Sequence, residues 1–257
     1  MSTEWTFEKE LLFPLVSGTD VGRYQTLPER QYILFPYRVV DESAELIRFE
    51  LLSRSYPRTT SYLLENKRTL ETRERGKFRD ARWYRFGRSQ NLGIQARVKL
   101  CVPRLVDRLY AAYDAEGNHF LDNVDVGGIT VKARHAGHTL PYLLGLLNSA
   151  VLRWYFPHVA GRFRGGWLSA NRQFLSQIPI RAVNFDDPKD VALHDRMVAL
   201  VERMLDLHKK LAAATIPADK KLYGRRIEAT DKEIDALVYE LYGLTEEEIA
   251  IVEGRDT

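Results

Sequence analysis

The stretch from Arg79 to Asn91 interleaves arginines, aromatic rings and side-chain amides. Guanidinium groups suit phosphates and guanine edges, and amides suit adenine edges, so this mixture is typical of a surface that binds nucleic acid and reads its bases. The competing interpretation for the rings is core packing, which we expect for Trp83 and Phe86. For the polar side chains beside them we expect exposure and contact with nucleic acid: Arg85, Arg88, Ser89 and Gln90.

A second stretch, Gly161 to Trp167, repeats the mixture, with Arg162 and Arg164 on either side of Phe163. Its glycines indicate a surface loop, so a mobile loop without a ligand is the competing interpretation. The complete set of predicted DNA-binding residues is Arg73, Arg75, Lys77, Arg79, Arg82, Arg85, Arg88, Ser89, Gln90, Lys99, Arg162, Arg164, Asn171 and Arg172. Among them we predict that Arg88 and Gln90 read bases, because arginine suits guanine and glutamine suits adenine.

The positive charge of the chain is concentrated in one segment. The whole sequence has a net charge of only +3, but residues 54–104 carry 14 basic and 4 acidic side chains, and 11 of these cations are arginines. A local arginine-rich region predicts a polyanion-binding surface, in which we expect Arg73, Arg75, Lys77 and Lys99 to contact phosphates. The alternative is a solvated helix face whose cations form ion pairs within the protein.

Sequence motifs for catalysis are missing from the 257 residues. There is no Walker phosphate loop, no Gly-x-Ser-x-Gly elbow, no His-Glu-x-x-His zinc helix and no glycine-rich dinucleotide turn. Cys101 lies in an apolar strand pattern and is predicted to be a buried, inert thiol. His135 and His138 lack further ligands for a zinc site, and Asp122 and Asp125 lack the Asp/Glu-x-Lys sequence of metal-dependent nucleases. We therefore predict no catalytic residue and no metal site in this chain.

Length and composition indicate an ordinary globular protein of one large or two modest domains, with 45% hydrophobic and 28% charged residues. The most apolar stretch, residues 140–156, is interrupted by Asn148, Ser149 and Arg153, so no membrane span is expected. The N-terminus lacks the features of a secretory signal, and a single cysteine cannot form a disulfide within the chain. These features predict a soluble protein of the reducing cytoplasm.

The elements that must position the polar residues begin with a sheet-rich part. A helix is expected from Pro57, where apolar positions recur at spacings of three and four, and it should end near Gly76. A hairpin is expected around the turn-forming residues 114–118, which join the runs 109–113 and 119–121. The other predicted strands are Gln31–Phe35, which we expect to be buried, Ala81–Phe86, Arg97–Val102 and Ile129–Ala133.

The rest of the chain is predicted to be mainly helical. From Thr139, a capping residue, apolar side chains recur along one helix face, and a short helix is expected at Asn171–Ser176. Asp187 and Pro188 open a new helix whose apolar residues follow a heptad spacing, and a second heptad stretch follows Pro217. These two helices are predicted to pack antiparallel on each other.

A last short helix and a division into two parts complete the predicted fold. Thr245 and Glu248 have the spacing of a capping box at the start of that helix. The predicted fold class is α+β: a mixed, sheet-rich recognition domain with packed helices over residues 1–182, followed by an antiparallel helical hairpin over residues 183–257.

Several short motifs occur in an order that resembles one protein family. They are Pro14-Leu15-Val16-x-Gly18-x-Asp20-Val21-x-Arg23-Tyr24, then Tyr32 to Tyr37, Tyr62-Leu63 with Leu70 and Arg73, Trp83-Tyr84 with Gly87-Arg88, Leu143 to Ser149, and Phe174-Leu175-x-x-Ile178-Pro179-Ile180. Over residues 11–182 this set resembles the TaqI-like C-terminal specificity domain of restriction-modification DNA methyltransferases. The heptad helices and the sequence Tyr239 to Thr245 resemble the helical tail that often follows in such enzymes.

The resemblance implies a domain that clamps double-stranded DNA opposite a methyltransferase domain, which binds S-adenosylmethionine and methylates adenine at N6. No Asn-Pro-Pro-Tyr-type motif and no cofactor-binding glycine motif occurs in this sequence, so the chain alone is not expected to methylate. We expect a DNA-recognition module of such a methyltransferase or methyltransferase-endonuclease, either excised from a longer polypeptide or supplied as a separate subunit. The alternative from another class is a protein-interaction scaffold, in which the heptad helices bind a partner and the basic surface is incidental.

Overall fold

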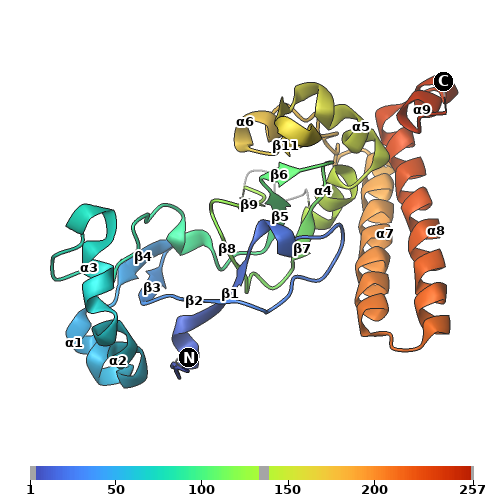
Figure 1. Cartoon of the computed structure of the whole chain (residues 1–257). Coiled ribbons are helices and arrows are strands. Elements are labelled where there is room, and N and C mark those ends of the chain that lie inside the picture. The colour runs from blue at the N-terminus through green and yellow to red at the C-terminus, as the bar shows by residue number, and fades with distance from the viewer. Residues whose placement is uncertain (1–3, 133–138, 256–257) are drawn as a thin grey trace. The chain divides into compact units, whose positions relative to one another are not determined.

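The computed structural model describes residues 4–132 and 139–255, and Figure 1 labels most of their helices and strands. The chain forms two compact units, each assembled from separate stretches of sequence. Unit 1 comprises Met1–Leu15, Glu29–Arg97 and Asn118–Phe120, and unit 2 comprises Val16–Pro28, Val98–Gly117 and Leu121–Thr257. The predicted boundary between residues 182 and 183 lies within unit 2, so the compact units are divided differently from the expected domains.

The strands that lie wholly or partly in unit 1 are short. They are β1 (Leu12–Val16), β2 (Tyr32–Leu34), β3 (Tyr37–Val40), β4 (Ser43–Leu46) and β8 (Phe120–Leu121). β1 pairs antiparallel with β2, with Leu12 opposite Leu34, and β8 lies on the other side of β1. β3 and β4 form a separate hairpin, and Gly93 packs so closely against its turn that a Cβ atom there would overlap the Glu42 carbonyl group. Only glycine fits this position without a shift of the backbone.

Three consecutive helices follow in unit 1: α1 (Phe49–Ser55), α2 (Pro57–Glu65) and α3 (Lys67–Gly76). The single helix predicted from Pro57 is therefore divided at Asn66, and the helical backbone angles end before Arg73. Glu74 and Arg75 have φ angles of 47° and 61°, a left-handed conformation that non-glycine residues rarely adopt. This conformation turns the chain into the arginine-rich segment that follows α3.

Two clusters of buried side chains hold unit 1 together. One cluster contains Leu11, Ile47, Leu52, Leu63, Trp83 and Tyr84. In the other, the Phe35 ring lies 4.8 Å from the Phe120 ring in a T-shaped contact and 5.9 Å from the Phe86 ring. Core packing is thus confirmed for Trp83, which is 5% exposed, whereas Phe86 is half-buried at the edge of the aromatic cluster.

The described residues of unit 2 form two small sheets. Their strands are β5 (Lys99–Pro103), β6 (Leu105–Val106), β7 (Ala112–Asp114), β9 (Val126–Ile129), β10 (Gly161–Arg162) and β11 (Leu168–Ser169). In one sheet, β5 lies between β7 and β9, pairs antiparallel with both, and is buried along its whole length. The other sheet has the order β10-β11-β6. The predicted hairpin is wrong, because β7 pairs with β5 and β8 belongs to the sheet of β1.

The helices that follow in unit 2 are α4 (Leu140–Leu147), α5 (Ala150–Val159), α6 (Arg172–Leu175), α7 (Pro188–Ala213), α8 (Pro217–Tyr242) and α9 (Glu246–Val252). The predicted caps are confirmed at Thr139, Asp187 and Thr245, whose side chains accept backbone hydrogen bonds from the first turns of α4, α7 and α9. The apolar face predicted from Thr139 is divided between α4 and α5, because Ser149 caps a new helix. No helix in the described ranges is long and apolar enough to cross a membrane.

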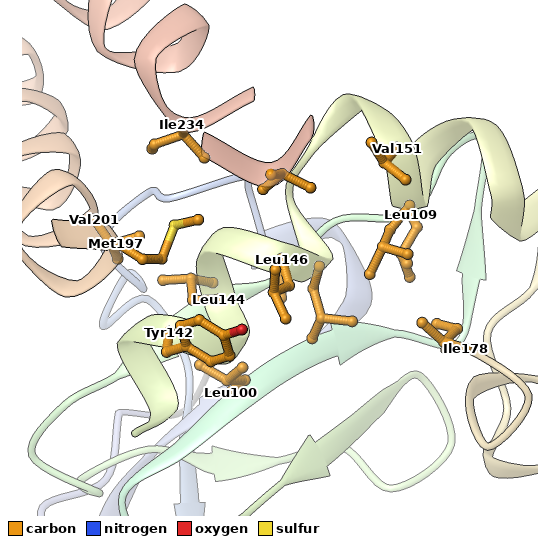
Figure 2. Close-up of a cluster of buried hydrophobic side chains, with 14 of the residues drawn as sticks. Leu100, Leu109, Tyr142, Leu144, Leu146, Val151, Ile178, Met197, Val201 and Ile234 are labelled. Carbon is orange, nitrogen blue, oxygen red and sulfur yellow. The ribbon is translucent and has the colours of Figure 1, made fainter. Parts of the chain in front are cut away.

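The core of unit 2 contains α4 packed against α7, which in turn packs against α8 (Figure 2). Leu144 and Leu146 of α4 are buried with Met197 of α7 and Ile234 of α8. Gly145 brings α4 close to α7, because a Cβ atom at this position would overlap the Met197 side chain.

The helical hairpin predicted from the heptad spacing is confirmed: α7 and α8 lie side by side, joined by a short turn (Figure 1). Its apolar seam is buried within this chain, against its own partner helix and α4. The buried seam residues are Met197, Leu200, Met204, Leu207, Thr230, Ile234, Leu237 and Leu241. The alternative of a scaffold whose heptad helices bind a partner through this seam is therefore not supported, because the seam is already buried. The predicted α+β class is confirmed.

Polar contacts also attach α8 to the rest of unit 2. Arg23 Nη1 donates to Asp231 Oδ2 at 2.9 Å, and Arg23 Nε donates to the Asn148 carbonyl oxygen at 3.0 Å. The backbone N–H of Ala150 donates to Asp235 Oδ1 at 2.7 Å. The turn between α4 and α5 is therefore tied to α8 by charge-assisted hydrogen bonds, which are stronger than neutral ones.

Three strand predictions differ from the structure. Residues 81–86 form turns, since the Asp80 side chain accepts a hydrogen bond from the Arg82 N–H at 2.8 Å and so favours a turn over a strand. The strand predicted at 129–133 is β9, which ends at Ile129, and residue 133 lies outside the described ranges. The strand predicted at 31–35 is confirmed in position as β2, but it is not fully buried, because Tyr32 is 51% exposed.

Candidate nucleic-acid interface

The segment from the end of the helical backbone of α3 to Asn91, residues 73–91, is called here the arginine loop. Two neighbouring aromatic residues fix it to the core of unit 1. Trp83 and Tyr84 are buried, and the Tyr84 hydroxyl donates to the Ile47 carbonyl oxygen at 2.6 Å. The polar residues before and after these anchors are therefore held at the surface by the burial of their neighbours.

Two predicted DNA-binding arginines stabilise the arginine loop from within. Arg73 Nη2 donates to the carbonyl oxygens of Trp83 and Arg85, each at 2.9 Å, and its guanidinium group lies 4.3 Å from the centre of the buried Phe78 ring. Arg85 Nη1 donates to Asp80 Oδ1 at 2.6 Å, and the Arg85 guanidinium group lies 4.7 Å from the same ring. The hydrogen bond from Arg85 lowers the pKa of the Asp80 carboxyl group. We assign Arg73 and Arg85 a positioning role.

The other predicted residues of the arginine loop are exposed. They are Arg75, Lys77, Arg79, Arg82, Arg88, Ser89 and Gln90. Lys77 Nζ lies 3.2 Å from Glu74 Oε2, but both side chains are more than half exposed, so this pair contributes little. The guanidinium groups of the four arginines in this set form neither an ion pair nor a hydrogen bond with any residue that the structure describes. The loop therefore exposes four guanidinium groups without an ion-pair partner to the solvent.

Unit 2 carries a second candidate surface at residues 161–167, called here the glycine loop. Gly165 and Gly166 have φ angles of 82° and 83°, which glycine adopts without strain. The Phe163 N–H donates to the Trp167 carbonyl oxygen at 2.7 Å and closes the loop. As a result two large rings lie at the surface, since Phe163 is 58% and Trp167 is 45% exposed. Arg164 is exposed beside them.

A shallow pocket lies beside the glycine loop within unit 2. Phe163, Trp167, Arg104, Tyr110 and Asn171 are among its lining residues. Arg104 Nη1 donates to Asn171 Oδ1 at 3.2 Å, which holds the guanidinium group at the edge of the pocket. Aromatic faces beside a guanidinium group and an amide suit the bases and phosphates of nucleic acid.

The residues around this pocket were predicted only in part. Arg162, Arg164, Asn171 and Arg172 belong to the predicted set, and all four are exposed. Sequence reasoning missed Arg104, which immediately follows the buried strand β5 and lies 67 residues from Asn171 in sequence. The sequence signal that could have indicated Arg104 is its place directly after a buried strand, because the chain usually reaches the surface where such a strand ends.

Lys99 was wrongly assigned to the phosphate-contacting set. Its side chain is only 3% exposed, and Nζ lies 2.6 Å from Oδ2 of Asp114, which is 2% exposed. The two residues are opposite each other in the β5–β7 register. A buried ammonium group needs a buried partner, so the charge of Lys99 serves the core of unit 2 and does not reach a phosphate.

Two of the residues considered for catalysis or metal binding, Cys101 and Asp122, have structural settings. The prediction for Cys101 is confirmed: the residue is buried, and burial raises the pKa of its thiol to about 12. Within residues 4–132 and 139–255, no three His, Cys, Asp or Glu side chains are grouped to hold a metal ion. Asp122 Oδ1 instead accepts the Val124 N–H at 2.9 Å. His135 and His138 lie outside the described residues.

Comparison with known proteins assigns the chain to a family. A family model described as the TaqI-like C-terminal specificity domain matches residues 13–180. The chain belongs to this family. It is 26% identical over 255 residues to RM.Eco57I, a type II restriction enzyme and methyltransferase of Escherichia coli, and 22% identical over 258 residues to M.BstVI, a type II methyltransferase of Geobacillus stearothermophilus. These alignments cover 94% and 95% of this chain but 25% and 36% of the relatives, so it spans between a quarter and about a third of their length.

Several motif residues of this TaqI-like domain have structural roles. Arg23 binds Asp231 of α8, and Asn148 exchanges side-chain hydrogen bonds of 2.8 and 3.1 Å with the Ala111 backbone. The carbonyl oxygen of Pro179 accepts the Tyr242 hydroxyl at 2.6 Å. The motif residues Arg23, Asn148 and Pro179 therefore attach separate segments of the chain to one another, whereas Arg88, which also belongs to a motif, is an exposed cation.

Proposed function

We propose that this chain recognises a specific sequence in double-stranded DNA on behalf of a restriction-modification methyltransferase. The observation that carries the proposal is a set of exposed guanidinium groups in a chain of the specificity-domain family: those of Arg75, Arg79, Arg82 and Arg88, which form no ion pair with an acidic side chain of the described residues. Exposed cations that are not paired within the protein attract a polyanion and release its counterions on binding.

The arginine loop offers two kinds of contact to DNA. Arg88 and Gln90 are exposed and adjacent to the Ser89 hydroxyl, so we assign them to the reading of guanine and adenine edges. Arg75 and Lys77 are assigned to phosphates, which fix position without reading sequence. Arg73 and Arg85 are engaged in contacts within the loop, so we assign the DNA contacts to the exposed side chains only.

The glycine loop is assigned to the same function. Arg162, Arg164 and Arg172 are exposed cations, and Arg164 and Arg172 have no side-chain partner among the described residues. The Trp167 and Phe163 rings offer apolar faces beside them. We propose that this loop contacts the same duplex through phosphates and through the apolar surface of bases.

The reaction itself is assigned to another part of the protein or to a partner subunit. Both relatives have methyltransferase in their names, and this chain corresponds to 25% and 36% of their lengths. We propose that the remaining part binds S-adenosylmethionine and transfers the methyl group, with adenine N6 as the target. Methyl transfer by this chain alone is expected to be absent, and turnover without an added partner would contradict this assignment.

The experiment that tests the proposal is selection from a pool of randomised DNA duplexes with the 257-residue chain. Enrichment of one short sequence is expected, and an unchanged pool would refute sequence recognition. On the enriched duplex, Arg88→Ala should cost about 1–3 kcal/mol and blur the preference, whereas Lys77→Ala should weaken binding to all duplexes alike. Equal losses on all duplexes for both variants would refute the assigned roles while leaving DNA binding intact.

A further inference from the structure

The helical hairpin has a strongly uneven distribution of charge. Residues 208–226, at the turn between α7 and α8, carry six basic and one acidic side chains. The other residues of 184–257 carry five basic and sixteen acidic side chains. The C-terminal part of the chain is therefore acidic except at the turn of the hairpin, and the predicted function does not use this contrast.

We call the six basic residues the hairpin tip: Lys209, Lys210, Lys220, Lys221, Arg225 and Arg226. All six side chains are exposed. Lys210 Nζ lies 2.6 Å from Asp206 Oδ2, and both side chains are 52% exposed. The other five cations form no ion pair and no side-chain hydrogen bond with any residue in the described part of the chain. Ion pairs and side-chain hydrogen bonds of these five cations therefore do not hold the hairpin together.

The hairpin tip has dimensions that match a nucleic-acid backbone. The four cations of α8 lie within the first ten residues of that helix, which span about 15 Å at 1.5 Å per residue. Double-stranded DNA carries about one negative charge per 1.7 Å of its axis, so a duplex presents several phosphates over this length. Small residues separate the cations of the two helices, since Ala212, Ala213, Ala214 and Ala218 surround the turn.

We infer that the hairpin tip binds phosphates of double-stranded DNA without reading sequence, as a contact additional to the arginine and glycine loops. The inference rests on the proposed function, because it takes the bound duplex as the ligand. Four of the six cations are lysines, whose compact ammonium group suits single phosphates rather than the paired acceptors of a base edge. An acidic protein surface is the other polyanion that this cluster fits, and the test separates the two.

The test compares two variants of the full chain. The tip variant is Lys209→Gln/Lys220→Gln/Lys221→Gln/Arg225→Gln, in which glutamine keeps helix propensity and side-chain length. The control variant is Lys232→Gln. Lys232 is exposed and lies seven residues from Arg225 and eleven from Lys221, spacings that place all three on one face of α8. Its sequence neighbours are Asp231 and Glu233, so the control variant removes a positive charge from the acidic part of the hairpin.

Affinity is measured for a duplex of about 30 base pairs of random sequence while sodium chloride is varied. If the tip binds at least two phosphates, the tip variant should lose at least about tenfold in affinity near 0.1 M salt, and its slope of log affinity against log salt should be shallower by about 2. The control variant should match the wild-type slope. Circular dichroism should show the same helix content in all three proteins.

The outcomes separate this inference from the proposed function. If the wild-type chain does not bind the duplex, the proposed function fails and the inference fails with it. If the wild type binds but the tip variant has the same affinity and slope, only the inference is overturned. It is also overturned if the tip variant keeps its affinity for DNA but loses affinity for polyglutamate, since the tip then binds an acidic polypeptide.

Discussion

The buried ion pair between Lys99 and Asp114 gives a quantitative test of the structure. Their charged atoms lie 2.6 Å apart, and the two side chains are 3% and 2% exposed. Removing one partner of a buried pair leaves the other charge in a poorly solvated site, which typically costs about 3–5 kcal/mol. We therefore expect Asp114→Ala to lower the free energy of unfolding by about this amount, measured by urea titration with circular dichroism.

A double variant separates charge burial from packing. Lys99→Met/Asp114→Leu removes both charges and keeps apolar volume, so its free energy of unfolding should equal or exceed that of the wild type. Replacing a buried pair in this way is often neutral or stabilising, whereas breaking it is not. A double variant that is as unstable as Asp114→Ala would show that packing, and not the unpaired charge, causes the loss.

Variants of Lys99 also test our conclusion that this residue does not contact DNA. Lys99→Met should lower stability but leave the salt dependence of DNA binding unchanged, because the ammonium group does not reach solvent. Lys77→Met, at an exposed position of the arginine loop, should do the opposite and make the slope of log affinity against log salt shallower by about 1. A stable Lys99→Met variant with a shallower slope would refute the reasoning.

Two further predictions concern glycines and pH. Gly93→Ala should destabilise the protein, because its Cβ atom would overlap the Glu42 carbonyl group at the turn of the β3–β4 hairpin. Gly224→Ala, in open space on α8, should instead stabilise the protein by about 0.5–1 kcal/mol. A variant whose urea midpoint equals that of the wild type would contradict the corresponding prediction. Burial, followed by the charge of Arg23, lowers the pKa of His208 from 6.5, so the unfolded chain binds a proton more readily than the folded one. Stability should therefore fall as the pH drops below 6.5, and His208→Gln should reduce that fall in urea titrations at several pH values; an unchanged fall would exclude His208 as its source.

The elements predicted well are those whose signals are local. Thr139, Asp187 and Thr245 cap helices because each side chain accepts a hydrogen bond from a residue two or three positions away. The heptad spacing of α7 and α8 predicted their packing because the turn between them is short and the seam repeats along both helices. Such signals are complete within a few residues, so the sequence alone contains them.

The elements predicted badly depend on distant partners. The partner of β7 is β5 rather than β8, so the pairing depends on strands that are distant in sequence and not on the turn-forming residues 114–118. Trp83 and Tyr84 have high strand propensity, but burial in the core of unit 1 and the Asp80 turn place them in an irregular segment. Tertiary contacts override propensity at both places.

The candidate site was predicted as a region, and the structure divides its members by role. Arg88 and Gln90 are exposed as expected, whereas Arg73 binds carbonyl groups of the loop itself. Lys99 cannot be told from an exposed cation by sequence, because its partner Asp114 lies fifteen residues away on another strand. Charge counts locate a basic region, but only the contacts show which charges are free.

The central claim is that cations left unpaired by the fold bind double-stranded DNA. The most direct measurement is the affinity of the wild-type chain for a duplex over a range of sodium chloride concentrations. If about five cations contact phosphates, log affinity should fall against log salt with a slope of about −4.5. A flat response, or no binding at low salt, would contradict the claim.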